Sequence, residues 1–175
     1  DLKSGAIAVP FNFRYTANEI SYCADLADVS VLIFGEEFVD RLTINEDDIA
    51  KNRLLIYVGE GQAPEFAESY WHMVADYSSE DPDIALTNED LAAIYFSSGT
   101  TGFPKAILHK HSALMHSAIM EQRHHGQQKN DTFLCIPPLY HTGAKMHWFG
   151  SLLSGSKAVL LKGTKPEFVL EAVSK

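Results

Sequence analysis

Several features that mark whole classes of protein are missing from this 175-residue sequence. No apolar run approaches the ~20 residues that a helix needs to cross a bilayer, so we expect no membrane-spanning segment. The first residues contain neither a basic stretch nor a long apolar run, so a secretory signal is not expected there. A globular protein is expected instead, because 46% of the residues are apolar and 21% are charged.

Cysteine is scarce, and the histidines lack the spacing of a metal site. Cys23 and Cys135 both lie in apolar stretches, which favours buried thiols over a disulfide or a metal pair. A reducing cytoplasm is the simplest compartment for such thiols. Seven of the eight histidines lie between positions 109 and 147, but H-E-x-x-H and C-x-x-C are absent, so no metal site is predicted. The serine-hydrolase pattern G-x-S-x-G is absent as well.

Basic residues are few in the first part of the chain. Residues 1–104 contain 19 acidic residues against 5 Lys and Arg, whereas residues 105–175 contain 4 against 9. The net charge of −9 argues against a nucleic-acid partner, because such proteins normally present a basic face. The change of sign at Lys105 favours an anionic small ligand there, although an uneven solvated surface is an alternative explanation.

Short apolar runs rich in β-branched residues alternate with helical patterns. The lack of polar alternation in these runs suits strands buried on both faces of a sheet. The expected strands are 5–10, 29–34, 53–58, 91–96, 105–109, 131–136 and 157–161. Strands that alternate with helices predict an α/β fold with a largely parallel sheet and flanking helices. No internal domain boundary is evident, so residues 1–175 are interpreted as a single partial domain.

Four segments carry helix signals. The first, 16–27, begins with a capping box from Thr16 to Glu19. The second, 64–77, begins at Pro64, and the last, 166–173, also begins at a proline. The third, 112–126, has a candidate cap at Ser112 and ends at Gly126.

The stretch SSGTTGFPK, residues 97–105, directly follows the expected strand 91–96. By composition alone it is most simply a solvated turn. The same residues could instead hold an oxyanion, because glycine backbone, hydroxyl groups and the Lys105 ammonium would converge on a phosphate. Pro104 restricts the residue before it to extended conformations and would hold the exit of the loop open. It is not a Walker A loop, since G-x-x-x-x-G-K-[ST] is absent.

The longer segment YFSSGTTGFPKAILHKH resembles the phosphate-loop signature of the adenylate-forming superfamily. This superfamily includes acyl-CoA synthetases, luciferases and peptide-synthetase adenylation domains. Segments 5–34 and 131–161 are similar to the family's segments before and after the loop, in the same order. Ala106 departs from the pattern, because the family usually has glycine after the lysine. The phrase PPLYHTGA, residues 137–144, is more like acyl-CoA ligases than peptide-synthetase domains.

The resemblance implies roles for individual residues. Those expected to contact the β- and γ-phosphates of ATP are Ser97, Ser98, Gly99, Thr100, Thr101, Gly102 and Lys105. Thr100 and Lys105 would act catalytically by stabilising the charge on the departing pyrophosphate, with Mg²⁺ sharing that task. His141 would orient the carboxylate, with a purely structural histidine as the alternative. Met146, Trp148 and Phe149 could line an acyl pocket, but an apolar helix face is the favoured interpretation.

The implied parent protein is an acyl-CoA synthetase that joins a small-molecule carboxylic acid to coenzyme A through an acyl adenylate. This chain resembles part of the amino-terminal domain, without the family's adenine site or carboxy-terminal domain. We therefore expect the isolated chain to be inactive and to self-associate through apolar surface exposed by truncation. An adenylation domain that loads a carrier protein and a non-catalytic nucleotide-binding fragment are the alternatives. The sequence does not indicate which acid is used.

Overall fold

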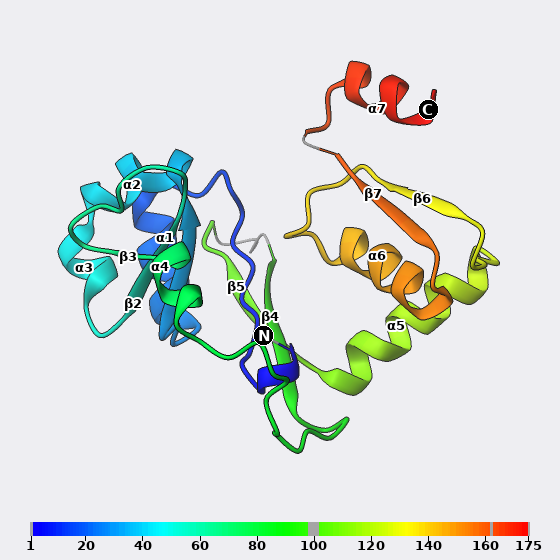
Figure 1. Cartoon of the computed structure of the whole chain (residues 1–175), viewed down its shortest axis with the longest axis horizontal. Coiled ribbons are helices and arrows are strands. Elements are labelled where there is room, and N and C mark those ends of the chain that lie inside the picture. The colour runs from blue at the N-terminus through cyan, green and yellow to red at the C-terminus, as the bar shows by residue number, and fades with distance from the viewer. Residues whose placement is uncertain (1, 98–101, 162, 175) are drawn as a thin grey trace. The chain divides into compact units, whose positions relative to one another are not determined.

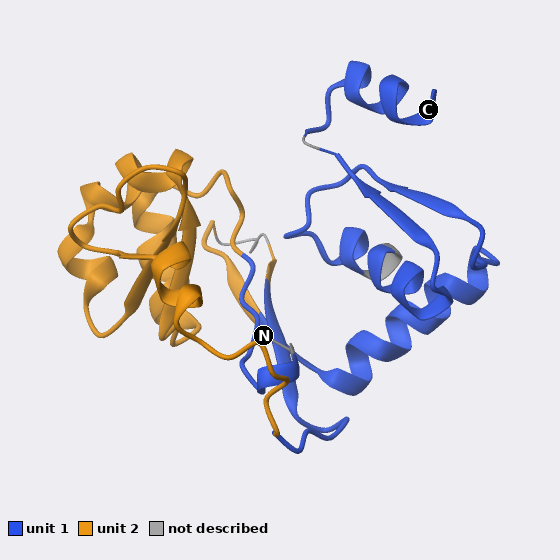
Figure 2. Ribbon diagram, in the orientation of Figure 1, with its two compact units in different colours: residues 1–10, 84–95, 107–175 blue, residues 11–83, 96–106 orange. Residues whose placement is uncertain are grey.

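The computed structural model describes residues 2–97, 102–161 and 163–174. The chain divides into two compact units, shown in two colours in Figure 2. Unit 1 consists of residues 1–10, 84–95 and 107–175, and unit 2 consists of residues 11–83 and 96–106. Strands and helices alternate along the chain (Figure 1), which confirms the predicted α/β class. Whether residues 1–175 behave as one partial domain stays a prediction.

Unit 2 is built on a three-stranded parallel sheet with the order β1-β2-β3. The strands are β1 (Val31–Gly35), β2 (Leu54–Val58) and β3 (Glu68–Ser69). Its helices are α1 (Ala17–Leu26), α2 (Val39–Ile44), α3 (Glu46–Ala50) and α4 (Tyr70–Ala75), with a 3₁₀ turn at Glu36–Phe38. The helices and the sheet share one apolar core, whose buried members are Ile20, Phe34, Leu42, Ile49, Leu55 and Tyr57.

Helix α1 begins where the sequence predicted. The Thr16 backbone N–H donates to the Glu19 carboxylate at 2.8 Å, and the Glu19 N–H donates to the Thr16 hydroxyl at 3.4 Å. This reciprocal pair is the expected capping box, and it satisfies two donors that a helix start leaves unpaired. The cap therefore fixes the face that buries Ile20 and Cys23.

The described part of the remaining chain adds two further pairs of strands and three helices. β4 (Leu91–Ser97) and β5 (Lys105–Lys110) form a two-stranded sheet, and the boundary between the units falls within both strands. β6 (Thr132–Cys135) and β7 (Lys157–Leu160) pair in parallel. The helices are α5 (His111–His124), α6 (Thr142–Ser154) and α7 (Pro166–Val173), and a 3₁₀ turn covers Leu2–Ser4.

Several predicted elements differ from the structure. The expected strand 5–10 is reduced to one isolated bridge between Ala8 and Ala93. The helix expected over 64–77 is limited to α4, because residues 68–69 pair with β2 as β3. Pro64 consequently lies in a turn, where its carbonyl accepts from the Ala67 N–H at 3.0 Å.

Helix α5 begins one residue before the predicted cap at Ser112. Its N-cap is Lys110, which directly ends β5. The first helical N–H groups donate to carbonyl groups of the segment before β4, from His111 to Asp90 at 3.0 Å and from Ser112 to Asn88 at 2.9 Å. A side-chain cap is unnecessary because these carbonyls already satisfy the helix start. The predicted end at Gly126 is confirmed, and this glycine has a φ of +61°.

The prediction that the strands are buried on both faces agrees with the structure for only some of them. The middle residues of β2 and β4 are buried, as expected for such apolar runs. In β1 and β5, by contrast, apolar side chains such as Ile33 and Leu108 are exposed. Apolar runs therefore located these strands correctly without revealing which face is covered. None of the helices that the structure describes is both long enough and apolar enough to cross a bilayer.

Candidate functional site

The candidate phosphate loop begins at the end of the buried strand β4. Ala92, Ala93 and Tyr95 belong to one apolar cluster with Leu114 of α5. Ala93 also lies opposite Ala8, and the Ala8 N–H donates to the Ala92 carbonyl at 2.9 Å. Because this strand is enclosed, the start of the loop has a fixed position, as ligand-binding loops of α/β proteins require.

The structure describes the two ends of the loop. Ser97 is the half-buried last residue of β4, and Lys105 is the exposed first residue of β5. Between them, Gly102 has a φ of +93°, a conformation that residues with a side chain rarely adopt. Glycine is therefore required by the backbone at this position. The remaining predicted contacts, Ser98, Gly99, Thr100 and Thr101, lie outside the described residues.

The exit of the loop is anchored by packing. Pro104 is buried, and the ring of Phe103 lies 5.1 Å from the ring of Tyr22 on α1, although Phe103 is 60% exposed. These contacts, all within unit 2, hold the chain just before Lys105. The Lys105 side chain itself projects into solvent, where its ammonium can receive an anion.

His141 is positioned by the start of α6, in unit 1. It is the N-cap residue, its backbone N–H donates to the Pro138 carbonyl at 3.0 Å, and its side chain makes no capping bond. The exposed imidazole lies against the ring of Tyr140, with 4.3 Å between the ring centroids. The backbone therefore holds the residue while the imidazole is left to face solvent or substrate.

The three apolar candidates on α6 are not equivalent. Phe149 packs against the cluster of Ala92, Ala93, Tyr95 and Leu114, which supports the interpretation of this part of α6 as a helix face. Trp148 is half-buried, and its ring centroid lies 5.7 Å from that of Phe149. The side chain of Met146 lies outside the described set.

A residue that the sequence analysis did not select also belongs to this region. The ammonium of Lys145, on α6, lies 4.7 Å from the centroid of the Tyr95 ring. Burial lowers the pKa of Lys145 from its ordinary 10.5 to about 8. The Tyr95 ring also meets the imidazole of His109 edge to face, with 5.2 Å between the ring centroids. The only available signal was a single lysine within the apolar stretch of α6.

The cysteines are buried, as predicted. Cys23 is fully enclosed, and burial raises its pKa from 9.0 to about 11. Burial also raises the pKa of Cys135, whose Sγ lies 3.7 Å from the carbonyl oxygens of Pro137 and Ala144. Both groups therefore remain thiols at neutral pH. Within residues 2–97, 102–161 and 163–174, no group of three or more His, Cys, Asp or Glu side chains could hold a metal ion.

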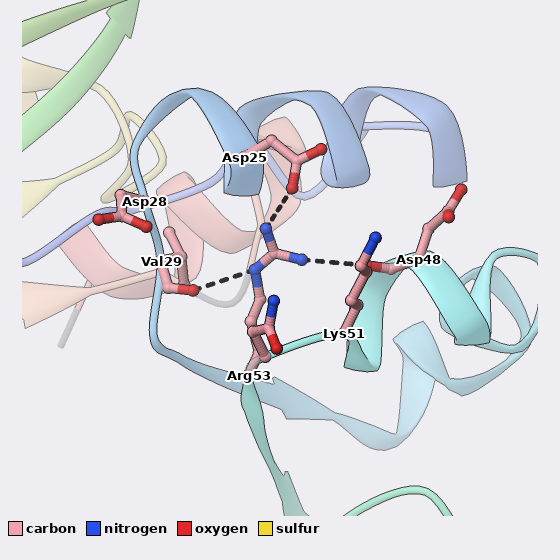
Figure 3. Close-up of a pocket in the computed structure, with 7 residues that line it drawn as sticks. Asp25, Asp28, Val29, Asp48, Lys51 and Arg53 are labelled. Atoms are coloured by element: carbon pink, nitrogen blue, oxygen red, sulfur yellow. Dashed lines mark hydrogen bonds and ion pairs between the residues drawn. The ribbon is translucent and has the colours of Figure 1, made fainter.

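A separate polar cleft in unit 2 surrounds the guanidinium of Arg53 (Figure 3). Its donors bind the carbonyl oxygens of Val29, Asp48 and Ile49, and it forms an ion pair with Asp25. The guanidinium is thus engaged by the protein itself. This arrangement is structural, and it joins the end of α3 to the segment that follows α1.

Residues 2–175 match the model of a known family, described as AMP-binding enzyme. The chain therefore belongs to this family of adenylate-forming enzymes. It is 24% identical over 179 residues to 4-hydroxybutyrate–CoA ligase 2 of Metallosphaera sedula, which covers 98% of this chain and 33% of that protein. The chain thus spans about a third of the length of this relative.

Solved structures confirm the fold. ATP-bound MatB from Rhodopseudomonas palustris superposes with a TM-score of 0.82 at 21% identity, covering 99% of this chain and 33% of that one. The inhibitor-bound N-terminal domain of FACL13 from Mycobacterium tuberculosis superposes with a TM-score of 0.77 at 21% identity, covering 98% and 42%. The α/β arrangement is therefore that of the N-terminal domains of adenylate-forming enzymes.

Proposed function

We propose that this chain is the phosphate-binding and carboxylate-binding part of an ATP-dependent acyl-CoA ligase. The observation that carries the proposal is the family match over residues 2–175. The segment SSGTTGFPK runs from Ser97, the last residue of β4, to Lys105, the first residue of β5. The ligase activity printed for the M. sedula relative supports the choice of reaction. The longer protein that would contain this chain is called the parent enzyme below.

In the proposed reaction a substrate carboxylate oxygen attacks the α-phosphorus of ATP. The bond to the bridging oxygen breaks, and pyrophosphate leaves with the electron pair. Lys105 and the hydroxyl groups of the loop would stabilise this developing charge, since fixed donors are most effective where charge appears in the transition state. The positive φ of Gly102 allows the backbone to turn close to the phosphates.

The second step would transfer the acyl group from the adenylate to the thiol of coenzyme A, and AMP would leave. His141 is proposed to orient the carboxylate in the first step, because its imidazole is exposed at the start of α6. Mg²⁺ would accompany the phosphates of ATP and offset their charge. Since the described residues hold no ligand cluster for it, no side chain is assigned to the metal.

The test is acid-dependent pyrophosphate release by the parent enzyme with ATP and Mg²⁺. A panel of short, medium, long and aromatic acids would identify the substrate class. Release that depends on one class of acid supports the proposal, whereas no release with any acid would favour a non-catalytic nucleotide-binding protein. The isolated chain, measured in parallel with light scattering, is expected to release none and to self-associate through exposed apolar residues such as Leu108 and Leu170.

The acceptor is tested separately. Coenzyme A and a phosphopantetheinyl carrier protein would be offered to the parent enzyme after acyl adenylate has formed. Formation of acyl-CoA supports the ligase. Loading of the carrier protein alone would identify an adenylation domain, the alternative that the sequence left open.

A further inference from the structure

Lys145 has no anionic partner among the residues that the structure describes. By contrast, Arg53 forms an ion pair with Asp25, and Lys110 forms one with Glu89. Lys145 is half-buried, and its ammonium lies 4.7 Å from the centre of the Tyr95 ring. An aromatic face replaces part of the hydration that burial removes, but it does not neutralise the charge.

The described residues linked to Lys145 through the Tyr95 ring and the backbone also include no carboxylate. His109, from β5, contacts the Tyr95 ring edge to face, and His141 lies one helical turn before Lys145. The Lys145 N–H donates to the His141 carbonyl at 3.4 Å, so the two residues belong to the same turn of α6. These neighbours of Lys145 are thus one aromatic ring, which itself contacts one imidazole, and the His141 backbone, without a carboxylate among them.

A half-buried ammonium that lacks a counter-ion lowers stability, and such a cost is typical of positions that receive a charged ligand. The complementary ligand is an oxyanion, and the proposed reaction supplies two: the carboxylate of the acid and the phosphates of ATP. The carboxylate is favoured because Lys145 shares a helical turn with His141, whereas the phosphates already have Lys105.

We propose that the Lys145 ammonium, carried on the Tyr95 ring, binds the carboxylate group of the acid substrate beside His141. This inference rests on the proposed ligase function. It assigns Lys145 as a substrate-binding residue and Tyr95 as the platform that positions it. Arginine can keep the charge at this position, whereas methionine keeps the length and apolar stem but removes the charge.

The first test uses kinetics of the parent enzyme with Lys145→Met, Lys145→Arg and the matched control Lys110→Met. We expect Lys145→Met to raise KM for the acid about 10- to 100-fold, as expected for loss of one charge-assisted hydrogen bond, with KM for ATP nearly unchanged. Lys145→Arg should restore most of this loss. Lys110 pairs with Glu89 at the surface, so its variant should resemble the wild type.

The dependence of kcat/KM on pH distinguishes a substrate-binding lysine from a purely structural one, because loss of a structural lysine would not change it. In the wild type, kcat/KM for the acid should fall as the pH rises through about 8, because Lys145 loses its proton there. This fall should be absent in Lys145→Met. An unchanged acid KM and an unchanged profile in that variant would overturn the inference, and a change confined to KM for ATP would assign Lys145 to the phosphates instead.

The second test is independent of turnover. The lysines of the parent enzyme would be labelled by reductive ¹³C-dimethylation, and the Lys145 signal would be assigned by its absence in Lys145→Met. Butyrate, octanoate and benzoate are the carboxylate probes, and inorganic pyrophosphate is the phosphate probe. A shift of the Lys145 signal with a carboxylate supports the inference, whereas no shift, or a shift with pyrophosphate alone, contradicts it.

The two tests separate this inference from the proposed function. A parent enzyme that releases pyrophosphate normally while Lys145→Met keeps the wild-type acid KM would retain the function and lose the inference. A parent enzyme that releases none with any acid would lose the function, and the carboxylate titration of the Lys145 signal would still decide the inference.

Discussion

The ammonium of Lys145 lies 4.7 Å from the centre of the Tyr95 ring, and this contact joins α6 to β4. Tyr95 is buried two residues before Ser97, where the candidate phosphate loop begins. Lys145 follows His141 by one helical turn. One contact within unit 1 therefore connects the strand that leads to the loop with the helix that carries the proposed carboxylate-binding residues.

The shifted pKa of Lys145 predicts how stability depends on pH. The folded pKa of about 8 lies below the ordinary 10.5, so between these values the unfolded chain binds a proton that the folded chain does not. Stability from this group therefore rises as the pH increases from about 8 to about 10.5, and below pH 8 the full cost of the buried ammonium is present.

Urea unfolding at pH 7, 9 and 10.5 can measure this effect as the difference between the wild type and Lys145→Met. We expect the wild type to gain stability relative to the variant across this range. Cys23 acts in the opposite direction, since its raised pKa removes stability between about pH 9 and pH 11. Because Cys23 is present in both proteins, its contribution cancels in the difference. A difference that is constant with pH would contradict the expected titration of Lys145.

Lys105→Ala and Thr100→Val are expected to slow adenylation in the parent enzyme. The substitutions remove a charge and a hydroxyl that are proposed to face the departing pyrophosphate. A fixed donor of this kind is worth about 2.7–4 kcal/mol in the transition state, or about 10²–10³ in rate. Single-turnover formation of the acyl adenylate is the measurement, and Lys110→Ala, on the same strand, is the control. Wild-type rates in both loop variants would return residues 97–105 to the role of a solvated turn.

His141→Ala is expected to lower kcat/KM for the acid more than the affinity for ATP. The exposed imidazole caps no helical N–H with its side chain, so its removal should leave α6 and the fold intact. Acid and ATP titrations of the parent enzyme, with thermal unfolding as a check on folding, separate the two effects. Kinetics equal to those of the wild type would make His141 a structural residue only.

Local sequence signals predicted those features of the fold that depend on local interactions. The Thr16–Glu19 capping box, the proline at the start of α7 and the glycine after α5 each act within one or two turns of chain. The segment 64–77 was misjudged because its conformation depends on distant partners. Phe66 packs into the unit 2 core and stacks on Phe34 at 6.1 Å, and residues 68–69 pair with β2.

The residues of the candidate site also fall into two groups, those that the sequence could indicate and those that it could not. The loop motif and His141 could be selected because their residue types resemble a known pattern. Lys145 could not, since its environment is created by Tyr95, which lies 50 positions earlier in the sequence. Neither residue has an unusual local context, and only the packing of α6 near β4 brings them together.

Arg53 gives a prediction for the stability of unit 2. Its side chain is 8% exposed, and the guanidinium donates to the carbonyl oxygens of Val29 at 3.0 Å and Asp48 at 3.1 Å (Figure 3). It also donates to the carbonyl oxygen of Ile49 at 3.2 Å. The last two are carbonyls at the end of α3, which a helix leaves without intrahelical partners. Arg53→Met would remove the donor from all three carbonyls while filling most of the same space, and water can replace it only at the exposed Asp48 carbonyl.

We therefore expect Arg53→Met to lower the free energy of unfolding by about 1–3 kcal/mol, because the partly buried bonds to Val29 and Ile49 lose a charged donor. Arg53→Lys should lose most of this as well, since one ammonium cannot replace a planar fork of donors. The matched control is Asp25→Asn. The Asp25 carboxylate is 73% exposed, so loss of its ion pair should cost at most about 1 kcal/mol. Urea unfolding of the three variants decides the order. If Asp25→Asn costs as much as Arg53→Met, the ion pair and not the carbonyl contacts holds this part of unit 2 together.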